Sequence, residues 1–395
     1  MTDRNRIRPC HGWPGLFCCL LITVLTTKLA ACPFCPGASV PLTEKLTHAP
    51  TACLVRWVEG DTGTIEKPGH TVFKVLKVIK QSQSTQYEKG SLITVNHYHF
   101  SKPGGPFLLT GTHGPKPLWE NPTAITPASY AYVMQAPSLQ KPTTERLQYF
   151  LKFLEHQDMI IANDAFAEFA NAPFEDIVPL TPQLPREKLH HWLSSKSTPA
   201  PRLGLYGLML GLCGNEDDID FMEDKINVQA QGLRSGIGGL MSGYLMLTGS
   251  EGLDHLERSK FQQKNTSPNE LFAAREAVSF MWTYGKGRYQ IPPERLRQSM
   301  RMLLNRPELA DLVIADLARW QDWTVMDRLV SLYDAEGYDY KGIRQAIIRY
   351  LLVASRYSDP SNGGPDATTA ARARKYLTLI RDRDPQLVKR AERFY

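Results

Sequence analysis

The chain has 395 residues, 42% hydrophobic and 22% charged, a balance typical of a folded globular protein that excludes disorder throughout. Its formal net charge of +6 lies at the ends: residues 1–31 carry +3 and residues 371–395 carry +5, which leaves −2 for the rest. There is no broad basic face and no nucleic-acid-binding motif, so we do not expect a nucleic-acid partner.

Residues 1–31 have the three parts of an export signal. Arginines at positions 4, 6 and 8 precede an apolar run of 12 residues, Leu16 to Thr27, and small residues then lead to Cys32. The run is shorter than the ~20 residues that a transmembrane helix needs. We expect export to the periplasm or the extracellular space, through cleavage after Ala31 or through lipidation of Cys32 in a lipobox-like Leu-Ala-Ala-Cys. An uncleaved anchor is the third interpretation, and we expect membrane contact only through this segment or a lipid.

Four segments that we expect to be strands follow, and the second of them, 71–79, is rich in β-branched and aromatic residues. They are 52–58, 71–79, 92–100 and 107–111, and the turns between them contain glycine or proline. Short strands joined by turns predict a small antiparallel barrel or sandwich. The pattern resembles OB-like netrin-type domains, the fold of the tissue inhibitors of metalloproteinases. We assign this β-domain to residues 32–111.

Residues 112–142 contain six prolines, at positions 115, 117, 122, 127, 137 and 142. Proline removes a backbone donor and interrupts helices, so long helices are not expected here. We interpret this Pro-rich segment as a joint between two domains, with a short strand at 130–133.

From Thr144 the apolar residues recur with the period of a helix. Helices are expected to begin near Asn163, Leu203, Leu233, Leu271, Leu309 and Ile343. This spacing, roughly 30–47 residues in known repeats, is typical of an α-solenoid. We therefore predict an α+β multidomain fold, in which HEAT-like helix pairs form a solenoid over 143–357 and a loop and a basic C-terminal helix occupy 358–395. Glycines within 204–211 and 236–243 predict close contact between helices, because glycine otherwise costs about 1 kcal/mol in a helix.

Nearly all of the chain after the signal is similar to a family of secreted planctomycetal proteins. The stretches that carry the resemblance are ACPFCPG (31–37), NDAFAEFANAPFEDIVPL (163–180), RLGLYGLMLGLCGNEDD (202–218), ERLRQSMRMLLNRPELADLVIADLARW (294–320) and KRAERFY (389–395). The resemblance implies export and a netrin-like β-domain before a HEAT-like helical domain, and it implies no activity. Leu29 departs from the A-x-A cleavage site that is usual in the family, which leaves lipidation of Cys32 open.

Four cysteines follow the signal. Cys32, Cys35 and Cys53 lie close in sequence, and an exported chain meets an oxidising compartment. We predict a disulfide in the N-terminal domain, joining Cys32 or Cys35 to Cys53, although the adjacent pair can also bridge. Cys213 lies in an apolar helical run and is expected to be a buried thiol.

Two functions would depend on these cysteines. Cys32-Pro-Phe-Cys35 resembles a glutaredoxin-type motif, but a redox thiolate needs a helix N-terminus after a strand, and Pro36-Gly37 makes a poor helix start. The resemblance to metalloproteinase inhibitors implies a second function, in which the free amine and carbonyl of Cys32 would chelate a zinc ion in the target.

Other motifs give little support for catalysis. His97 and His99 would share one face of a strand and could approach a metal, but a third ligand is not evident. The acidic run 216–220 lacks the spacing of an EF-hand and is expected to be a loop or the first turn of a helix. No hydrolase, P-loop or dinucleotide-binding motif is present in a usable context. We therefore expect no cofactor and no metal.

The most consistent function is a non-enzymatic binding scaffold, whose partner would be a protein or an envelope polymer. Four arginines, Arg295, Arg297, Arg301 and Arg306, with the basic tail, are candidates for a patch that binds an acidic partner. The alternative is that they pair with Glu294, Glu308 and Asp311 or extend over the helices.

Overall fold

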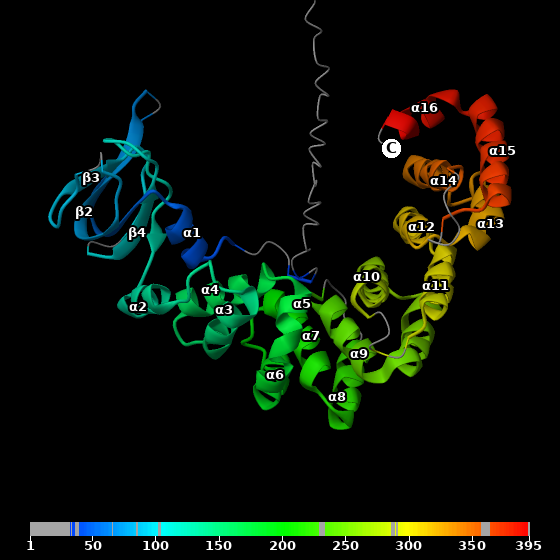
Figure 1. Cartoon of the computed structure of the whole chain (residues 1–395), viewed down its shortest axis with the longest axis horizontal. Helices are drawn as coiled ribbons and strands as arrows, with labels where there is room; N and C mark the ends of the chain where they lie inside the picture. Colours follow the sequence, from blue (N-terminus) through cyan, green and yellow to red (C-terminus); the bar gives the residue numbers. More distant parts are fainter. Residues whose placement is uncertain are drawn as a thin grey trace, which may run out of the picture.

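The structure, a computed structural model, describes residues 32, 34–35, 39–64, 66–83, 86–101, 104–228, 234–285, 289, 291–356 and 364–393. The predicted signal at 1–31 lies outside these residues. The described chain is α+β, with one small antiparallel sheet near its N-terminal end and helices over most of the rest. The sheet stands at one end of an arc of helices, and α16 (Pro385–Arg393) lies at the other end (Figure 1).

Five antiparallel strands form the sheet in the order β3-β2-β1-β4-β5. Their bounds are Thr51–Gly63 (β1), Pro68–Lys80 (β2), Leu92–Val95 (β3), Pro106–Gly111 (β4) and Thr123–Ala124 (β5). The strands expected at 52–58, 71–79 and 107–111 are confirmed. The strand expected over 92–100 is shorter, because the Thr71 hydroxyl, and not a ladder, binds the chain beyond Val95. It donates to the His97 carbonyl oxygen at 2.9 Å and accepts from the His99 N–H at 2.7 Å.

Alternation along the strands gives the sheet two apolar faces. Cys53, Val55, Phe107 and Leu109 belong to a small core of their own, with residues of β2 and β3. Leu108, which points to the opposite face, belongs to the large core of the helices. The sheet is therefore packed on the helical part through one face.

The segment before β1 departs from the predicted domain boundary. Cys32, Phe34 and Cys35 belong to the core of the helices, as does Leu42 in α1 (Leu42–His48). The start of the predicted β-domain therefore contacts the helical part, and Thr51 is the first residue of the sheet. The three apolar residues pack there because the helices offer a larger apolar surface than the small sheet.

The expected strand at 130–133 is wrong, since these residues lie in α2 (Pro127–Gln135). Thr126 and Ser129 form a capping box at its start, and Pro127 occupies the first helical position, where its missing N–H costs nothing. Proline therefore begins this short helix instead of preventing it.

The remaining helices follow in chain order, with short 3-10 turns between some of them and a π-helical turn after α9. They are α3 (Thr143–Phe150), α4 (Met159–Ala170), α5 (Phe174–Ile177), α6 (Arg186–Ser194), α7 (Leu203–Cys213), α8 (Glu216–Asn227), α9 (Ile237–Leu256), α10 (Pro268–Tyr284), α11 (Pro293–Met302), α12 (Ala310–Arg319), α13 (Met326–Leu332), α14 (Lys341–Ala354) and α15 (Ala367–Arg383). Each expected helix start lies within four residues of an observed one. The acidic run 216–220 forms the first turns of α8, as expected, with Asn215 as its cap. No helix in the described part of the chain is long and apolar enough to cross a membrane.

The close contact predicted from glycines is confirmed between α7 and α9. A Cβ on Gly207 would lie 2.6 Å from the Cα of Leu240, and a Cβ on Gly211 would lie 2.5 Å from the carbonyl oxygen of Gly243. Real side chains do not approach so closely, so only glycine permits this spacing of the two helices.

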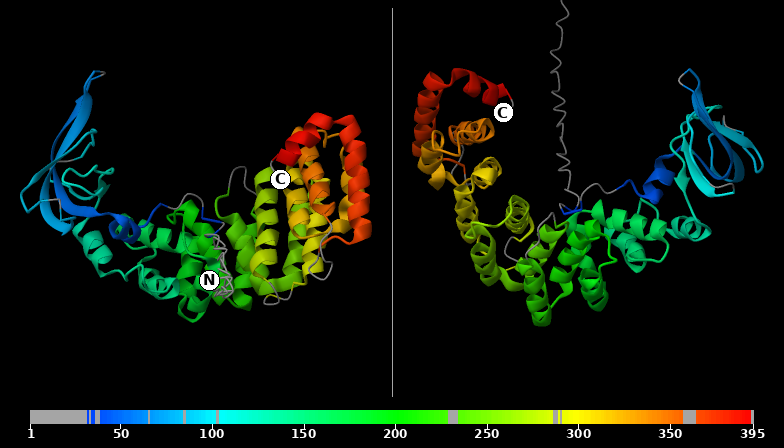
Figure 2. Two further views of the ribbon diagram at one scale, coloured as in Figure 1. Left: turned by 45° about the horizontal axis from the view of Figure 1, so that its top comes forward. Right: turned by 180° about the vertical axis from the view of Figure 1, so that it is seen from behind.

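Inner and outer helices alternate along the second half of the arc. α10, α12 and α14 lie on the inner side, and α11, α13 and α15 lie on the outer side (Figure 1). Both views of Figure 2 show the same curved arrangement, with α16 folded back beside α14. The basic end of the chain, expected as one helix, is divided between α15 and α16.

Candidate binding site

The N-terminal cysteines form a turn that is held by the helices. The N–H of Cys32 donates to the carbonyl oxygen of Ala170, at the end of α4, at 3.2 Å. The N–H of Cys35 then donates to the carbonyl oxygen of Cys32, also at 3.2 Å. Phe34 contacts the ring of Phe280 at 5.5 Å between centroids. It also fills space that a side chain on Gly204 or Gly238 would need.

This environment is unfavourable for a reactive thiol. Cys32 and Cys35 are 6% and 7% exposed, and both are free thiols. The pKa of the Cys35 thiol is raised, first by its hydrogen bond with Cys32 and then by burial. Redox and nucleophilic cysteines act as exposed thiolates, so the geometry argues against a glutaredoxin-like role.

The same turn bears on two further interpretations of Cys32. A zinc-chelating inhibitor needs the backbone amine and carbonyl of this residue, and both are already engaged with Ala170 and Cys35. A lipid on the sulfur would have to leave a site that is almost closed to solvent. Each of these functions would require the turn to leave its docked position.

Cys53 and Cys213 lie in other places. Cys53 is on β1, fully buried in the small core of the sheet and opposite Leu109 on β4. Cys32 and Cys35 belong to the core of the helices, so the predicted bridge to Cys53 would have to cross between two cores. Cys213 ends α7 and is half-buried, less than we expected. Burial raises the pKa of Cys53 and of Cys213 to about 11.

His97 and His99 do not share a strand face, because β3 ends at Val95. The ring of His99 meets Phe107 edge-on at 5.2 Å, and its carbonyl oxygen accepts from the Trp57 indole at 3.1 Å. Among the described residues, no group of three or more His, Cys, Asp or Glu could hold a metal ion. The ring of His99 therefore has a packing role.

Arg295 and Arg297, two of the expected partner-binding arginines, bind groups within the chain. Arg295 pairs with Glu257 at 2.6 Å and with Asp254. The pKa of Arg295 is raised, chiefly by its hydrogen bonds to Glu257. Arg297 donates to the carbonyl oxygen of Trp320 at 2.6 Å and has a longer contact with Glu294 at 3.5 Å.

Arg301 and Arg306 are engaged in the same way. Arg301 makes two hydrogen bonds to the buried carboxylate of Asp322, at 2.6 and 2.9 Å. Arg306 binds Glu308 at 2.8 Å and the carbonyl oxygen of Gln263 at 3.0 Å. All four arginines are thus partnered within the chain, so each would have to give up an internal contact to bind a partner. Pairing with Glu294 and Glu308 was the alternative that the sequence left open.

Two buried carboxylates on α4 hold α1 in place. Asp164 accepts from the N–H of Leu42 at 2.7 Å and from the Tyr132 hydroxyl at 3.0 Å, and Glu168 accepts from Thr43 and from Arg146 at 2.5 Å. Burial raises the pKa of both carboxyls. Pro41 cannot cap α1 with its side chain, so Asp164 binds one of the orphan N–H groups of that helix. We assign this cluster to structure.

A groove lies between the inner helices α12 and α14. It encloses about 580 Å³, and its lining includes the small residues Ala315, Ala318 and Ala346. Gln345 offers an amide, and Arg319 and Arg349 bring two guanidinium groups. This combination suits an extended chain that carries carboxylates, because small residues admit a backbone and arginine binds carboxylates with two parallel hydrogen bonds.

The arginines of the groove differ from the four described above. Arg319 is 70% exposed and shares the fully buried Asp316 with Arg275, which binds that carboxylate at 2.5 Å. Arg349 is exposed and makes no hydrogen bond or ion pair with any residue that the structure describes. Asp311 also lines the groove, so Arg275, Arg319 and Arg349 stand against two carboxylates, Asp316 and Asp311. The balance is one positive charge in excess.

Sequence reasoning missed Arg319 and Arg349 because it selected arginines that are close in sequence. A signal was present, since each follows an apolar run of an expected helix. Comparison of the chain with models of protein families and with curated proteins finds no match, so function is inferred from geometry.

Proposed function

We propose that this chain is an exported, non-enzymatic binding scaffold, and that the groove between α12 and α14 receives an acidic segment of a partner protein. The observation that carries the proposal is the pair Arg319 and Arg349, which leave positive charge beside a groove of about 580 Å³. Export rests on the sequence of residues 1–31 alone.

The helical part is proposed to be a HEAT-like α-solenoid. Its support is the alternation of inner and outer helices from α10 to α15. In such a stack each helix pair contacts mainly its neighbours, and the inner helices present a continuous concave surface. A long concave surface suits a partner in extended conformation.

The sheet is proposed to be OB-like, of the netrin type. The support is the strand pairing. β1 lies between β2 and β4 and pairs with both, and β2 also pairs with β3. Strand pairing of this kind occurs in OB-folds, where a five-stranded Greek-key sheet closes into a partly open barrel. This domain would be a second contact surface at the far end of the arc.

An acidic peptide fits the groove better than a bare anion. Gln345 can bind a peptide backbone, and the small side chains of Ala315 and Ala346 leave room for it. An anionic envelope polymer carries carboxylates, as an acidic peptide does, but it lacks the backbone amides. The experiment must therefore distinguish a polymer partner from a peptide partner.

The test measures binding of a fluorescent oligoglutamate peptide to the full chain by anisotropy. We expect Arg319→Ala/Arg349→Ala to weaken binding about tenfold, or ~1.4 kcal/mol, and we expect added salt to weaken the wild type. The matched control, Lys375→Ala/Lys389→Ala, removes two exposed charges outside the groove and should bind like the wild type.

Three outcomes would contradict the proposal. Equal weakening by the two double variants would mean that binding follows net charge and not the groove. Binding of polygalacturonate in preference to the peptide would indicate a polymer partner. Unchanged binding by the groove variant, with circular dichroism showing a folded chain, would exclude the groove.

A further inference from the structure

We propose that Cys32 and Cys35 join in a disulfide that fixes the N-terminal turn to the helices, while Cys53 and Cys213 remain thiols. This connectivity differs from the bridge to Cys53 that sequence proximity favoured. It depends on the proposed function only through export to an oxidising compartment.

The backbone brings the two cysteines within reach. The hydrogen bond from the Cys35 N–H to the Cys32 carbonyl oxygen joins the first and fourth residues of the segment, as in a β-turn. The first and last Cα atoms of such a turn lie less than about 7 Å apart, and disulfides need about 4.4–6.8 Å. The bond can therefore form without a large movement of the backbone.

Both side chains belong to the core of the helices. The influence of Cys32 also raises the pKa of the Cys35 thiol, ahead of the effect of burial. Phe34, between them in sequence, is 5% exposed and anchors the turn against Phe280. With both cysteines buried on the same surface, each is the nearest suitable partner of the other.

Cys53 is a poor partner for either. It is fully buried, and its strand is hydrogen-bonded on both sides, to β2 and to β4. Bringing its sulfur to Cys32 would require that strand to leave the sheet. Cys213 lies at the end of α7, whereas the turn contacts the start of that helix through Gly204.

The chemistry is thiol–disulfide exchange with a small disulfide such as oxidised glutathione. One cysteine thiolate attacks glutathione disulfide and releases one glutathione thiolate. The second cysteine thiolate then attacks the mixed disulfide and releases the other. In balance, two S–H bonds and the glutathione S–S bond break, the Cys32–Cys35 bond forms, and glutathione takes up the two electrons and two protons. Because the docked thiols are buried, exchange proceeds from the open turn, and docking then shields the finished bond.

The bond would have a structural role. It rigidifies the turn that connects the start of the mature chain to α4, α7 and α10. A lipid and a disulfide cannot occupy the same sulfur, so the bond also predicts that Cys32 is not lipidated.

The experiment maps the thiols of the full chain. Reduced, folded protein is oxidised with glutathione disulfide, denatured in acid, alkylated without reductant at neutral pH in denaturant, and digested with trypsin. Cys32 and Cys35 lie in one peptide that ends at Lys45, Cys53 lies in the peptide 46–56, and Cys213 lies in the peptide 203–225. We expect the first peptide to be unalkylated and lighter than its reduced form by two hydrogens. The other two peptides should be fully alkylated.

A second measurement tests whether the disulfide stabilises the folded chain. The oxidised wild type should show a thermal midpoint several degrees above that of the reduced wild type. Cys32→Ser/Cys35→Ser should lose this difference, and Cys53→Ser should keep it. If Cys53→Ser fails to fold, the peptide map of the wild type still shows which cysteines form the disulfide.

Three results would overturn the proposal. They are a disulfide that includes Cys53, alkylation of all four cysteines after oxidation, and a lipid on Cys32 in protein from an exporting host. Failure here leaves the peptide-binding result untouched, since that assay does not depend on the state of Cys32. Failure of peptide binding likewise leaves the disulfide standing.

Discussion

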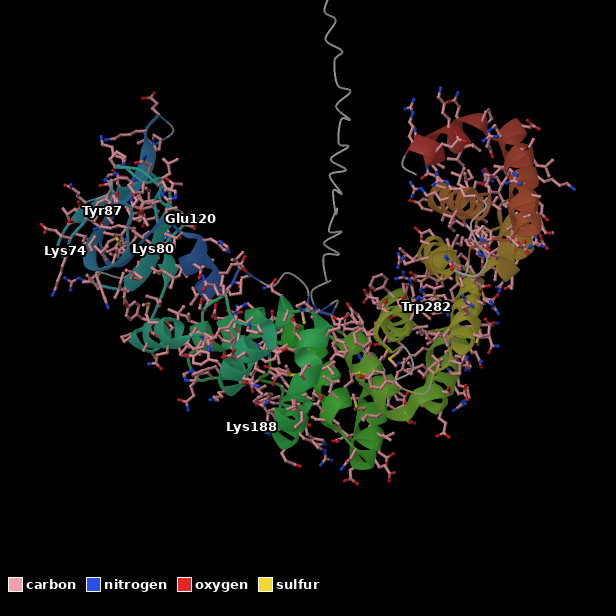
Figure 3. All side chains as sticks on the ribbon, in the orientation of Figure 1. Lys74, Lys80, Tyr87, Glu120, Lys188 and Trp282 are labelled. Carbon is pink, nitrogen blue, oxygen red and sulfur yellow. The ribbon has the colours of Figure 1, made fainter. Side chains whose placement is uncertain are left out.

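The indole rings of Trp282 and Trp320 stack with their centroids 4.4 Å apart and their planes 10° from parallel. Trp282, labelled in Figure 3, lies on α10, and Trp320 directly follows α12. Arg297 of α11 places its guanidinium over the Trp282 ring at 5.2 Å and also binds the carbonyl oxygen of Trp320. One aromatic and cationic layer therefore joins three consecutive helices.

This layer predicts a large cost for Trp320→Ala. The side chain is 2% exposed, so its loss should leave a cavity and lower the free energy of unfolding by about 3–5 kcal/mol. Trp282→Ala should cost less, because Trp282 is only half-buried. Urea unfolding of the two single variants and the double variant measures the coupling. Additive losses would show that the rings do not stabilise each other.

The ion pair of Arg301 with Asp322 should be far more important than an exposed pair. Asp322 is 2% exposed, and Arg301→Ala would leave its carboxylate buried without its charged partner, at a cost of about 3–5 kcal/mol. The matched control is Arg372→Ala, whose partner Asp327 lies 3.4 Å away with both side chains largely exposed. That variant should lose no more than about 1 kcal/mol in urea unfolding. If the two variants were equally stable, the pair of Arg301 with Asp322 would not stabilise the fold, and Arg301 could bind a partner at no cost in stability.

The parts of the fold that were predicted well depend on local patterns. Strand β2 contains many β-branched and aromatic residues, and the helices begin where apolar residues take up a period of 3.6. The contact between α7 and α9 was also predictable, because several glycines weaken a helix unless a second backbone packs closely against them.

The parts that were missed depend on distant residues. Tyr130 and Val133 have strand propensity, but the Thr126 cap and Pro127 begin a helix that packs on α4. The docking of Cys32 requires the end of α4, which lies far along the chain. The internal partners of the four arginines were also missed, because sequence proximity does not reveal which carboxylates, such as Asp322, will be buried beside each guanidinium.

The contact between α7 and α9 predicts that Gly207→Ala is destabilising. The new Cβ would lie 2.6 Å from the Cα of Leu240, so the two backbones would have to move apart, at a cost of about 1–3 kcal/mol or more. The control is Gly342→Ala in α14, where the new Cβ meets the ring of Tyr340. That ring is 70% exposed and can move, so the variant should be neutral or more stable. Loss of stability by the control alone would contradict the contact.

Glu276 on α10 predicts a change of stability with pH. Its carboxyl lies in a pocket of about 280 Å³ with Phe34 and Phe272. Burial raises its pKa from 4.5 to about 7, against an opposing effect of Arg275. A carboxyl with a raised pKa binds its proton more tightly in the folded chain than in the unfolded chain. Its contribution to stability is therefore complete below about pH 4.5 and is lost as the pH rises towards 7.

Glu276→Gln removes this titration. The variant and the wild type should have similar stability at pH 4, and the variant should be more stable at pH 8. Because the carboxyl is partly exposed, screening reduces the expected gain to about 1 kcal/mol. Urea unfolding across pH 4 to 8 measures the difference, and Glu251→Gln, an exposed glutamate on α9, is the matched control and should follow the wild type. A difference between Glu276→Gln and wild type that stays constant with pH would show that Glu276 titrates normally in the folded chain.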